Sequence, residues 1–227
     1  MPAVVEWGRR EYSESLDAMR SLVRERREGA ILDTLVLVEH PPVVTVGVEG
    51  DDGSAATSGL PIVSVDRGGR ATYHGPGQLV GYPIVDLEPR GRDVRRFVHD
   101  VEEVVVRSVA PFGVVAGHVS GRRGVWVAGE RKIASIGIAV DHWVTLHGFA
   151  LNVDPDLGAF DRFHPCGFSG SVMTSLSREV GRSVRLEEVV PHVIRSWQEV
   201  FGDPSGSAAG DPVGGVVPPA SAGSIPP

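Results

Sequence analysis

Two different spacings of hydrophobic residues constrain the fold of this chain more than any other feature. Apolar residues recur at helical spacing over residues 13–28, which are followed by Gly29, and again after Asp93, a residue type that caps helices. A third helical stripe covers residues 191–201. The stretches between these segments carry the β-branched runs of strands. Strands broken by so few helices predict a mixed α+β domain, a mixed sheet flanked by helices, and not an alternating doubly wound fold.

The expected strands lie on both sides of the second helix. They cover residues 33–40, 43–48, 61–66, 82–87, 125–127, 132–140 and 144–153. The glycine-rich stretch 67–81 is predicted to be a loop. Residues 154–172 are expected to be irregular, and 176–180 fit either a helix or a strand.

The last part of the chain has a different composition from the rest. Residues 204–227 consist mostly of Gly, Pro, Ala and Ser, and Asp211 is their only charged residue. Such a segment buries too little apolar surface to offset the entropy of ordering it. The sequence therefore predicts one catalytic domain over residues 1–203 and a disordered tail over 204–227.

Charge and composition exclude several classes of function. The net charge of −7 argues against a general nucleic-acid binder, which needs many phosphate contacts. No apolar run reaches the roughly 18 residues that span a bilayer, and the first residues do not resemble a signal peptide. A single cysteine excludes an internal disulfide. We expect a soluble cytoplasmic enzyme with no membrane contact and no cofactor. We also expect no metal, because no His and Cys residues cluster at the spacing of metal ligands.

The chain has one cysteine and one lysine, and both residue types can carry chemistry. Lys132 is the only lysine among 22 basic residues. Unlike arginine, lysine can give up its proton in a protein, although a coding bias toward arginine would also leave a lone lysine. Cys166 lies between turn-forming residues, so its thiol is expected on a loop. A nearby ammonium would stabilise its thiolate, and His164 and Lys132 are both candidates.

Three further segments combine small residues with polar ones. Residues 67–78 place glycines around Thr72, Tyr73 and His74, as in loops that let a backbone approach a ligand. Residues 132–137 and 147–153 look like strands with small residues interspersed. Small residues on a strand leave room for a ligand, or for close packing of another strand.

Taken together, these segments resemble the octanoyl-acyl-carrier-protein:protein octanoyltransferases, also called lipoyl(octanoyl) transferases. The resemblance covers roughly residues 30–180 and depends on four stretches in the family's order. They are RGGRATYHGPGQLVGYPIVDL at 67–87, RKIASIGI at 131–138, HGFALNV at 147–153, and PCGFSG at 165–170 with TSL at 174–176. It implies the mixed fold of the lipoate-protein ligases and of the catalytic domain of biotin protein ligases.

The resemblance also implies roles for individual residues. The acyl-thioester cysteine of the family matches Cys166, and the lysine that lowers its pKa matches Lys132. The acyl-substrate contacts match Arg67, Gly68, Gly69, Arg70, Ala71, Thr72, Tyr73, His74, Ser135, Ile136, Gly137, Gly148, Phe149 and Ala150.

The implied reaction is the first step of endogenous protein lipoylation. An octanoyl group passes from acyl carrier protein, where phosphopantetheine holds it, to Cys166 and then to a lysine of a lipoyl domain. The implied acceptors are the lipoyl domains of 2-oxoacid dehydrogenase complexes and the glycine cleavage H protein. Two alternatives of the same fold stay open, an ATP-dependent lipoate-protein ligase and an octanoyl amidotransferase. An inactive carrier-binding module is a third alternative, from a different class.

Overall fold

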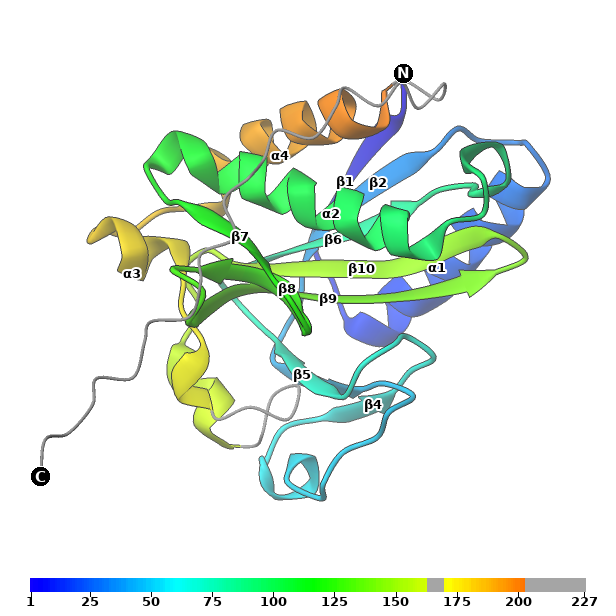
Figure 1. Ribbon diagram of the computed structural model, residues 1–227. Coiled ribbons are helices and arrows are strands. Elements are labelled where there is room, and N and C mark those ends of the chain that lie inside the picture. Colours follow the sequence, from blue (N-terminus) through cyan, green and yellow to red (C-terminus); the bar gives the residue numbers. More distant parts are fainter. Residues whose placement is uncertain (163–169, 203–227) are drawn as a thin grey trace, which may run out of the picture.

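The computed structural model describes residues 1–162 and 170–202 (Figure 1). Its helices are α1 (Tyr12–Arg27), α2 (Val94–Val109), α3 (Leu176–Val180) and α4 (Leu186–Phe201). Its strands are β1 (Ala3–Arg9), β2 (Thr34–Glu39), β3 (Val43–Val46), β4 (Ile62–Ser64), β5 (Ala71–His74), β6 (Gln78–Ile84), β7 (Ala116–Val119), β8 (Arg122–Val127), β9 (Arg131–Asp141) and β10 (Val144–Asn152). Short 3-10 helices include η4 (Leu157–Arg162) and η6 (Gly170–Val172). The predicted mixed α+β fold is confirmed.

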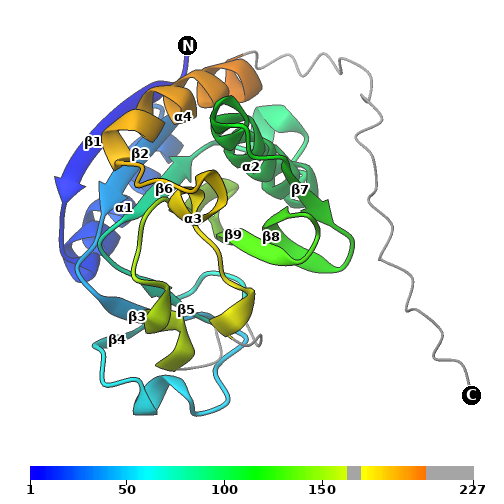
Figure 2. The same cartoon turned by 90° about the vertical axis from the view of Figure 1, so that its left-hand side faces the viewer.

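The strands form two sheets. The large sheet has the order β1-β2-β6-β10-β9-β8-β7, and the small one β4-β3-β5. The β1–β2 and β3–β4 pairs are parallel, and the other pairs are antiparallel. In Figures 1 and 2, α2 and α4 lie on one side of the large sheet and the small sheet lies on the other. Both sheets are therefore available to enclose a site between them.

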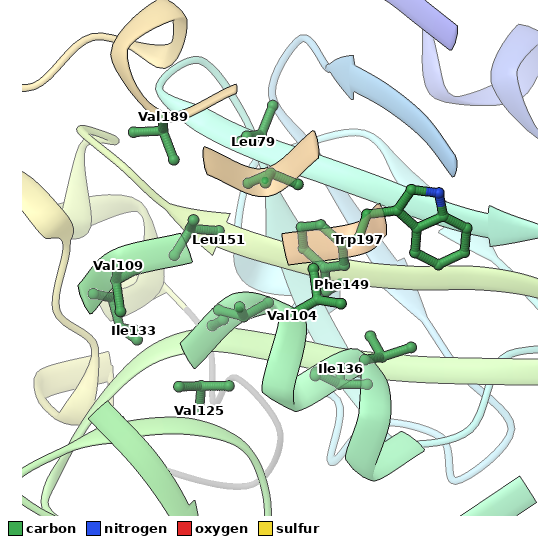
Figure 3. Packing of buried hydrophobic residues seen from close by; sticks show 14 of the residues in the cluster. Leu79, Val104, Val109, Val125, Ile133, Ile136, Phe149, Leu151, Val189 and Trp197 are labelled. Carbon is green, nitrogen blue, oxygen red and sulfur yellow. The ribbon is translucent and has the colours of Figure 1, made fainter. Parts of the chain in front are cut away.

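Each face of the large sheet has its own apolar core. The face under α2 and α4 is packed with residues such as Val104, Phe149 and Trp197 (Figure 3). The opposite face packs against α1 through Met19, with Val80 among the strand residues. Two cores on one sheet require apolar residues on both faces of its central strands, which explains their nearly continuous hydrophobic runs.

The predicted helices form at the expected places, with one different boundary. Residues 13–28 correspond to α1, and Asp93 caps α2 by accepting a hydrogen bond from the Arg96 N–H at 2.9 Å. The last helix was expected to begin at Pro191, a residue type favoured in the first turn. It begins five residues earlier, at Leu186, and Pro191 lies inside it. The ambiguous residues 176–180 form α3.

Three features of the sheets differ from the predictions. The predicted loop over 67–81 is wrong, because it contains β5 and most of β6. Strands β1 and β7 have no counterpart among the predictions. The glycines of residues 67–81 favour a loop over a strand. However, β6 pairs with β10 on one side and with β2 on the other, and this pairing stabilises a strand despite the low local propensity. Within the described ranges, no helix combines the length and apolarity needed to cross a membrane.

Candidate active site

A pocket of about 280 Å³ opens between the two sheets. Its walls come from β6, β9 and β10 of the large sheet and from β5 of the small one with the loop before it. Tyr12 of α1 closes one side, and Gly121, Arg122 and Arg123 border another. This volume lies at the lower end of the range for small-molecule sites, so the pocket suits a slender ligand.

Most of the residues predicted as substrate contacts line this pocket. They are Arg67, Gly69, Arg70, Thr72, His74, Ser135, Ile136, Gly137, Gly148, Phe149 and Ala150, together with Lys132. Ile136 and Phe149 belong to the core beneath α2 and α4 (Figure 3), whereas Ala150 belongs to the cluster under α1. Successive residues of a strand alternate between its faces, so only every second residue can present its side chain to the pocket.

Gly68, Ala71 and Tyr73 were also predicted as contacts but do not line the pocket. Ala71 and Tyr73 belong to a separate apolar cluster, where the Tyr73 ring meets the edge of Phe160 at a centroid distance of 5.4 Å. The alternation of β5 leaves Thr72 and His74 for the pocket side. Gly68 instead donates its N–H to the Ile138 carbonyl at 2.9 Å and ties its loop to β9.

Lys132 lies in the pocket wall near the start of β9 and is only 2% exposed. Its amine lies 5.6 Å from the centroid of the Trp126 ring, within range of a cation–π contact. The Lys132 carbonyl accepts a hydrogen bond from the Thr174 N–H at 3.0 Å, and Met173 forms a bridge with Lys132. The chain that follows Cys166 in sequence therefore runs beside the only lysine.

Cys166 lies outside the described residues, within the range 163–169, as does His164. The described chain fixes the surroundings of both ends of this range. Helices η4 and η6, which contain Arg162 and Gly170, contact each other, and Gly170 packs against the backbone of Phe160. Both ends of the range therefore lie close together. Gly170, the later of the two, comes three residues before Met173, which forms the bridge with Lys132.

Arg67 lines the pocket, but its guanidinium donates hydrogen bonds to other groups of the protein. One terminal nitrogen donates to the Thr45 carbonyl and hydroxyl, both at 2.8 Å. The other donates to the carbonyls of Gly68 at 3.1 Å and Arg70 at 2.9 Å. These bonds hold the loop against β3, so the side chain shapes the pocket wall.

The inner wall of the pocket carries the buried side chains of Tyr12, His74 and Tyr82, and His40 packs against all three rings outside the lining. His40 Nε2 lies 2.7 Å from the Tyr82 hydroxyl, and the Tyr12 and His74 rings stack at 5.7 Å. Burial lowers the pKa of His40 to about 4 and brings that of His74 well below its usual value. Burial also raises the pKa of Tyr12 to about 12. At neutral pH these groups carry no formal charge, so the wall is compatible with an apolar ligand.

His147 joins this wall to the surface. It is 1% exposed and has a φ of 60°, a conformation that is uncommon for residues other than glycine. Its Nε2–H donates to the half-exposed Asp66 carboxylate at 2.6 Å, and its Nδ1 faces the Tyr12 hydroxyl at 3.4 Å. Burial lowers the pKa of His147, which therefore acts as a neutral hydrogen-bonding group.

Arginines surround the mouth of the pocket. Arg70, Arg122 and Arg123 line it together with one acidic residue, Glu49. Glu49 pairs with Arg123 at 2.6 Å and accepts the Gly69 N–H at 3.2 Å. Three cations around a single anion favour a negatively charged group at this opening.

Sequence reasoning included His74 of the inner wall and Arg70 of the arginine border, but it missed the other residues of both features. Tyr82 and His147 lie inside the stretches that carry the family resemblance, so a signal for them was present. Tyr12 lies outside the site segments and reaches the pocket only through the packing of α1, and His40 packs against its ring from the end of β2. Arg122 and Arg123 precede a predicted strand and had no distinguishing pattern.

Known proteins resemble this chain over most of its length. Residues 11–198 match the family described as the lipoyl protein ligase A/B catalytic domain. An octanoyltransferase from Geobacter sulfurreducens is 47% identical over 185 residues, which cover 82% of this chain and 78% of the relative. An octanoyltransferase from Mycolicibacterium gilvum is 48% identical over 199 residues, which cover 85% and 82%.

Solved structures share the fold at much lower sequence identity. A lipoate-protein ligase A bound with ATP matches with a TM-score of 0.67 at 19% identity, over 88% of this chain and 85% of that one. A bipartite lipoate protein ligase from Thermoplasma acidophilum, studied with its E2 lipoyl domain, matches with a TM-score of 0.63 at 18% identity, over 88% and 83%. These likenesses agree with the fold described above.

Proposed function

Because this chain belongs to the lipoyl protein ligase A/B catalytic-domain family, and within it to the octanoyltransferases, we propose that it transfers octanoyl groups through an acyl thioester on Cys166. It is an acyltransferase of protein lipoylation. The observation that carries the Cys166 step is the position of Lys132. The only lysine of the chain is buried in the wall of the pocket, beside the segment that follows Cys166.

The first half of the reaction loads Cys166. The Lys132 ammonium stabilises the Cys166 thiolate, because an opposite charge lowers the pKa of a thiol. The thiolate attacks the thioester carbonyl of the donor, a new S–C bond forms, and the donor thiolate leaves and takes up a proton. One thioester replaces another, so the free energy of this step is close to zero.

The second half unloads Cys166 onto an amine. The acceptor lysine attacks the octanoyl carbonyl as a neutral amine, a C–N bond forms and the C–S bond breaks. Lys132, when it has lost its proton, can take one from the incoming amine, which arginine could not do. Amide formation from a thioester is downhill, so no nucleotide is required.

The arginine border supports a phosphopantetheine-linked donor. The phosphate of that prosthetic group is negatively charged, and Arg70, Arg122 and Arg123 lie where it would pass. We therefore propose acyl carrier protein as the donor. For the acceptor we propose lipoyl domains, including those of 2-oxoacid dehydrogenase complexes and the glycine cleavage H protein. The similarity to a ligase studied with its E2 lipoyl domain supports this choice.

Mass spectrometry of the intact protein tests the thioester. Incubation with octanoyl carrier protein should add one octanoyl group to the protein, and hydroxylamine should remove it. The Cys166→Ser variant should not be labelled and should not transfer. Transfer that depends on ATP and survives Cys166→Ser would contradict the proposal and favour a ligase.

A further inference from the structure

Two of the sequence stretches singled out above contain residues to which the proposed transfer steps give no role. Arg131 begins the stretch RKIASIGI, and Thr174 begins TSL. Both bond to Glu179 of α3, which lies at the end of the large sheet where β9 begins (Figure 1). We call the group formed by Arg131, Thr174 and Glu179 the α3 clamp.

The Glu179 carboxylate accepts three hydrogen bonds in the α3 clamp. Arg131 donates from Nε to Oε1 at 2.8 Å and from Nη2 to Oε2 at 2.9 Å, which is the bidentate geometry of a strong arginine–carboxylate pair. The Thr174 hydroxyl donates to Oε1 at 2.6 Å. The bonds from Arg131 lower the pKa of Glu179, so the carboxylate is charged at neutral pH. One carboxylate therefore ties β9 and α3 to the residues that precede α3.

The α3 clamp lies where β10 no longer supports β9. The ladder between these two strands reaches Ala134 and does not include Lys132. At Lys132 the chain forms an isolated parallel bridge with Met173 instead, and the Lys132 carbonyl accepts the Thr174 N–H at 3.0 Å. The segment before α3 thus replaces β10 as the neighbour of the strand that carries the lysine.

The ladder on the other side of β9 is also irregular at this point. Val125 of β8 pairs with Ala134, whereas the next residue, Trp126, pairs with Lys132. The extra residue, Ile133, forms a β-bulge, which offsets the start of β9 from the rest of the strand. The position of Lys132 therefore depends on contacts beyond the regular ladders of the sheet.

Thr174 is held through all three of its hydrogen-bonding groups. Its N–H bonds to Lys132, its carbonyl accepts from Asn152 at 2.9 Å, and its hydroxyl donates to Glu179. The residue is fully buried. It follows Cys166 by only eight residues in the sequence, so its position limits where the chain that leaves the cysteine can run.

Building on the Cys166 thioester proposed above, we propose that Glu179 is a positioning residue for octanoyl transfer. It holds the segment that follows the nucleophile against the start of β9, and so keeps that segment and Lys132 in one arrangement. Glu179 does not line the pocket. Its loss should therefore slow the chemical steps without weakening the binding of the donor.

Glu179→Ala tests this role through two measurements. The kcat for transfer from octanoyl carrier protein to a lipoyl domain should fall about 100-fold, the cost of a small misplacement in an active site, while the KM for the donor changes little. The pH midpoint for alkylation of Cys166 by iodoacetamide should rise, because the thiolate loses its ammonium partner. Removal of a negative charge alone would lower this midpoint, so the direction of the shift separates positioning from a purely electrostatic effect.

Conservative changes provide a second test. Thr174→Val keeps the shape of the side chain but removes the hydroxyl, so it should lower the kcat. Thr174→Ser keeps the hydroxyl and should recover most of that loss. The reversed pair, Arg131→Glu combined with Glu179→Arg, restores an ion pair and should transfer faster than Arg131→Glu alone.

Asp33→Asn is the matched control. Asp33 accepts a hydrogen bond from Arg26 Nε at 2.8 Å in a partly buried ion pair, and neither residue lines the pocket. This change should lower the melting temperature but leave the kcat and the alkylation midpoint as in wild type. Thermal melts identify any variant that does not fold.

Two results would overturn the positioning role alone. One is a wild-type kcat and midpoint in folded Glu179→Ala and Thr174→Val, and the other is a lowered midpoint in Glu179→Ala. In both cases wild type still forms the octanoyl adduct on Cys166. Absence of that adduct in wild type would overturn the proposed function, and the role of Glu179 with it.

Discussion

At the scale of single residues, the position of Lys132 depends on a glycine. Gly124 on β8 has a φ of 101°, and a methyl group there would lie 2.8 Å from Lys132 Cε. The Gly124 N–H donates to the buried Glu102 carboxylate at 2.9 Å. Helix α2 therefore fixes the backbone over which the lysine side chain lies, although Glu102 makes no contact with the pocket.

Replacing Lys132 with arginine separates charge from proton exchange. Lys132→Arg keeps a cation in the pocket wall but removes a group that can exchange a proton. We expect octanoyl transfer to fall by about 100-fold or more, the usual contribution of a positioned acid–base group. The pH midpoint for alkylation of Cys166 should change little. Transfer at the wild-type rate would show that Lys132 acts only through its charge.

Gly124→Ala tests whether Gly124 positions the lysine. The added methyl group meets the Ala134 carbonyl oxygen on β9 as well as Lys132, and it needs a backbone conformation that alanine rarely adopts. We expect a loss of about 1–3 kcal/mol in the free energy of unfolding. Alkylation of Cys166 should also move to a higher pH, because the ammonium is displaced. Gly117→Ala on β7, where an added methyl group meets nothing within 4 Å, is the control. An unchanged alkylation profile in the Gly124 variant would limit that glycine to a structural role.

At the scale of elements, the sequence predicts the parts of the site better than their orientation. The segments 67–78, 132–137 and 147–153 all reach the pocket, as expected from their small and polar residues. Which side chains face it depends on strand alternation, and the loop predicted over 67–81 hid that alternation. Ala71 and Tyr73 lie on the other side of β5, in a separate apolar cluster.

The inner wall shows what sequence patterns cannot supply. His40 directly follows β2 and Tyr12 begins α1, and their ring centroids are 5.2 Å apart although the two residues are 28 positions apart along the chain. Only the placement of α1 against the large sheet brings them together. Amphipathic spacing predicts that such a helix is buried on one face, but not which strands it covers.

A hydrogen-bonded chain links the pocket to the segment beside Lys132. His74 Nδ1 faces Gln78 Oε1 at 3.3 Å, Gln78 donates to Asn152 Oδ1 at 2.9 Å, and Asn152 donates to the Thr174 carbonyl at 2.9 Å. Because Thr174 in turn bonds to Lys132, this chain holds the end of β10 and residues 173–175 in register.

Asn152→Asp should break one link of this chain and keep the other. Aspartate still accepts from Gln78 but cannot donate to Thr174, whereas Asn152→Ala loses both bonds. We expect the free energy of unfolding to fall by about 1–3 kcal/mol in each variant, since buried polar groups lose partners. The kcat for transfer should fall more than the KM rises. Because Asn152 is the only asparagine of the chain, no second Asn→Asp change can serve as a control. Gln198→Glu on α4 is the surface control instead. A wild-type kcat in both Asn152 variants would contradict the link.

At the scale of the whole molecule, buried neutral histidines make stability depend on pH. The pKa values of His40, His74 and His147 are all lowered by burial, that of His40 to about 4. The unfolded chain takes up protons near pH 6.5, where the folded chain does not. Their contribution is therefore complete above pH 6.5 and is lost as the pH falls toward 4.

Urea unfolding at pH 7.5 and pH 5 measures this effect. His40 alone should lower the free energy of unfolding by about 2 kcal/mol between these values. His118 acts in the opposite direction, because its hydrogen bond to Glu102 and its contact with Glu103 raise its pKa to about 9. It is partly exposed, so screening limits its effect to about 1 kcal/mol. An equal free energy of unfolding at the two pH values in wild type would contradict the prediction. The control is His142→Gln at the surface, which should show the same change in free energy between the two pH values as wild type.

The predicted tail is tested by truncation. Residues 204–227 lie outside the described residues, and the pocket is built from residues 12–150. A protein that ends at residue 203 should transfer octanoyl groups at the wild-type rate and unfold at the wild-type temperature. A large loss of activity would mean that the tail binds a partner or completes the domain.

The burial of Lys132 also concerns what the enzyme does to itself. A catalyst that acylates lysines is its own nearest potential acceptor, yet no other lysine occurs anywhere in its sequence. All other residues among the 22 lysines and arginines are arginine, which does not compete as a nucleophile because it stays protonated. The surface therefore offers no side-chain amine for self-acylation, and the octanoyl group is kept for the foreign lysine presented at the pocket.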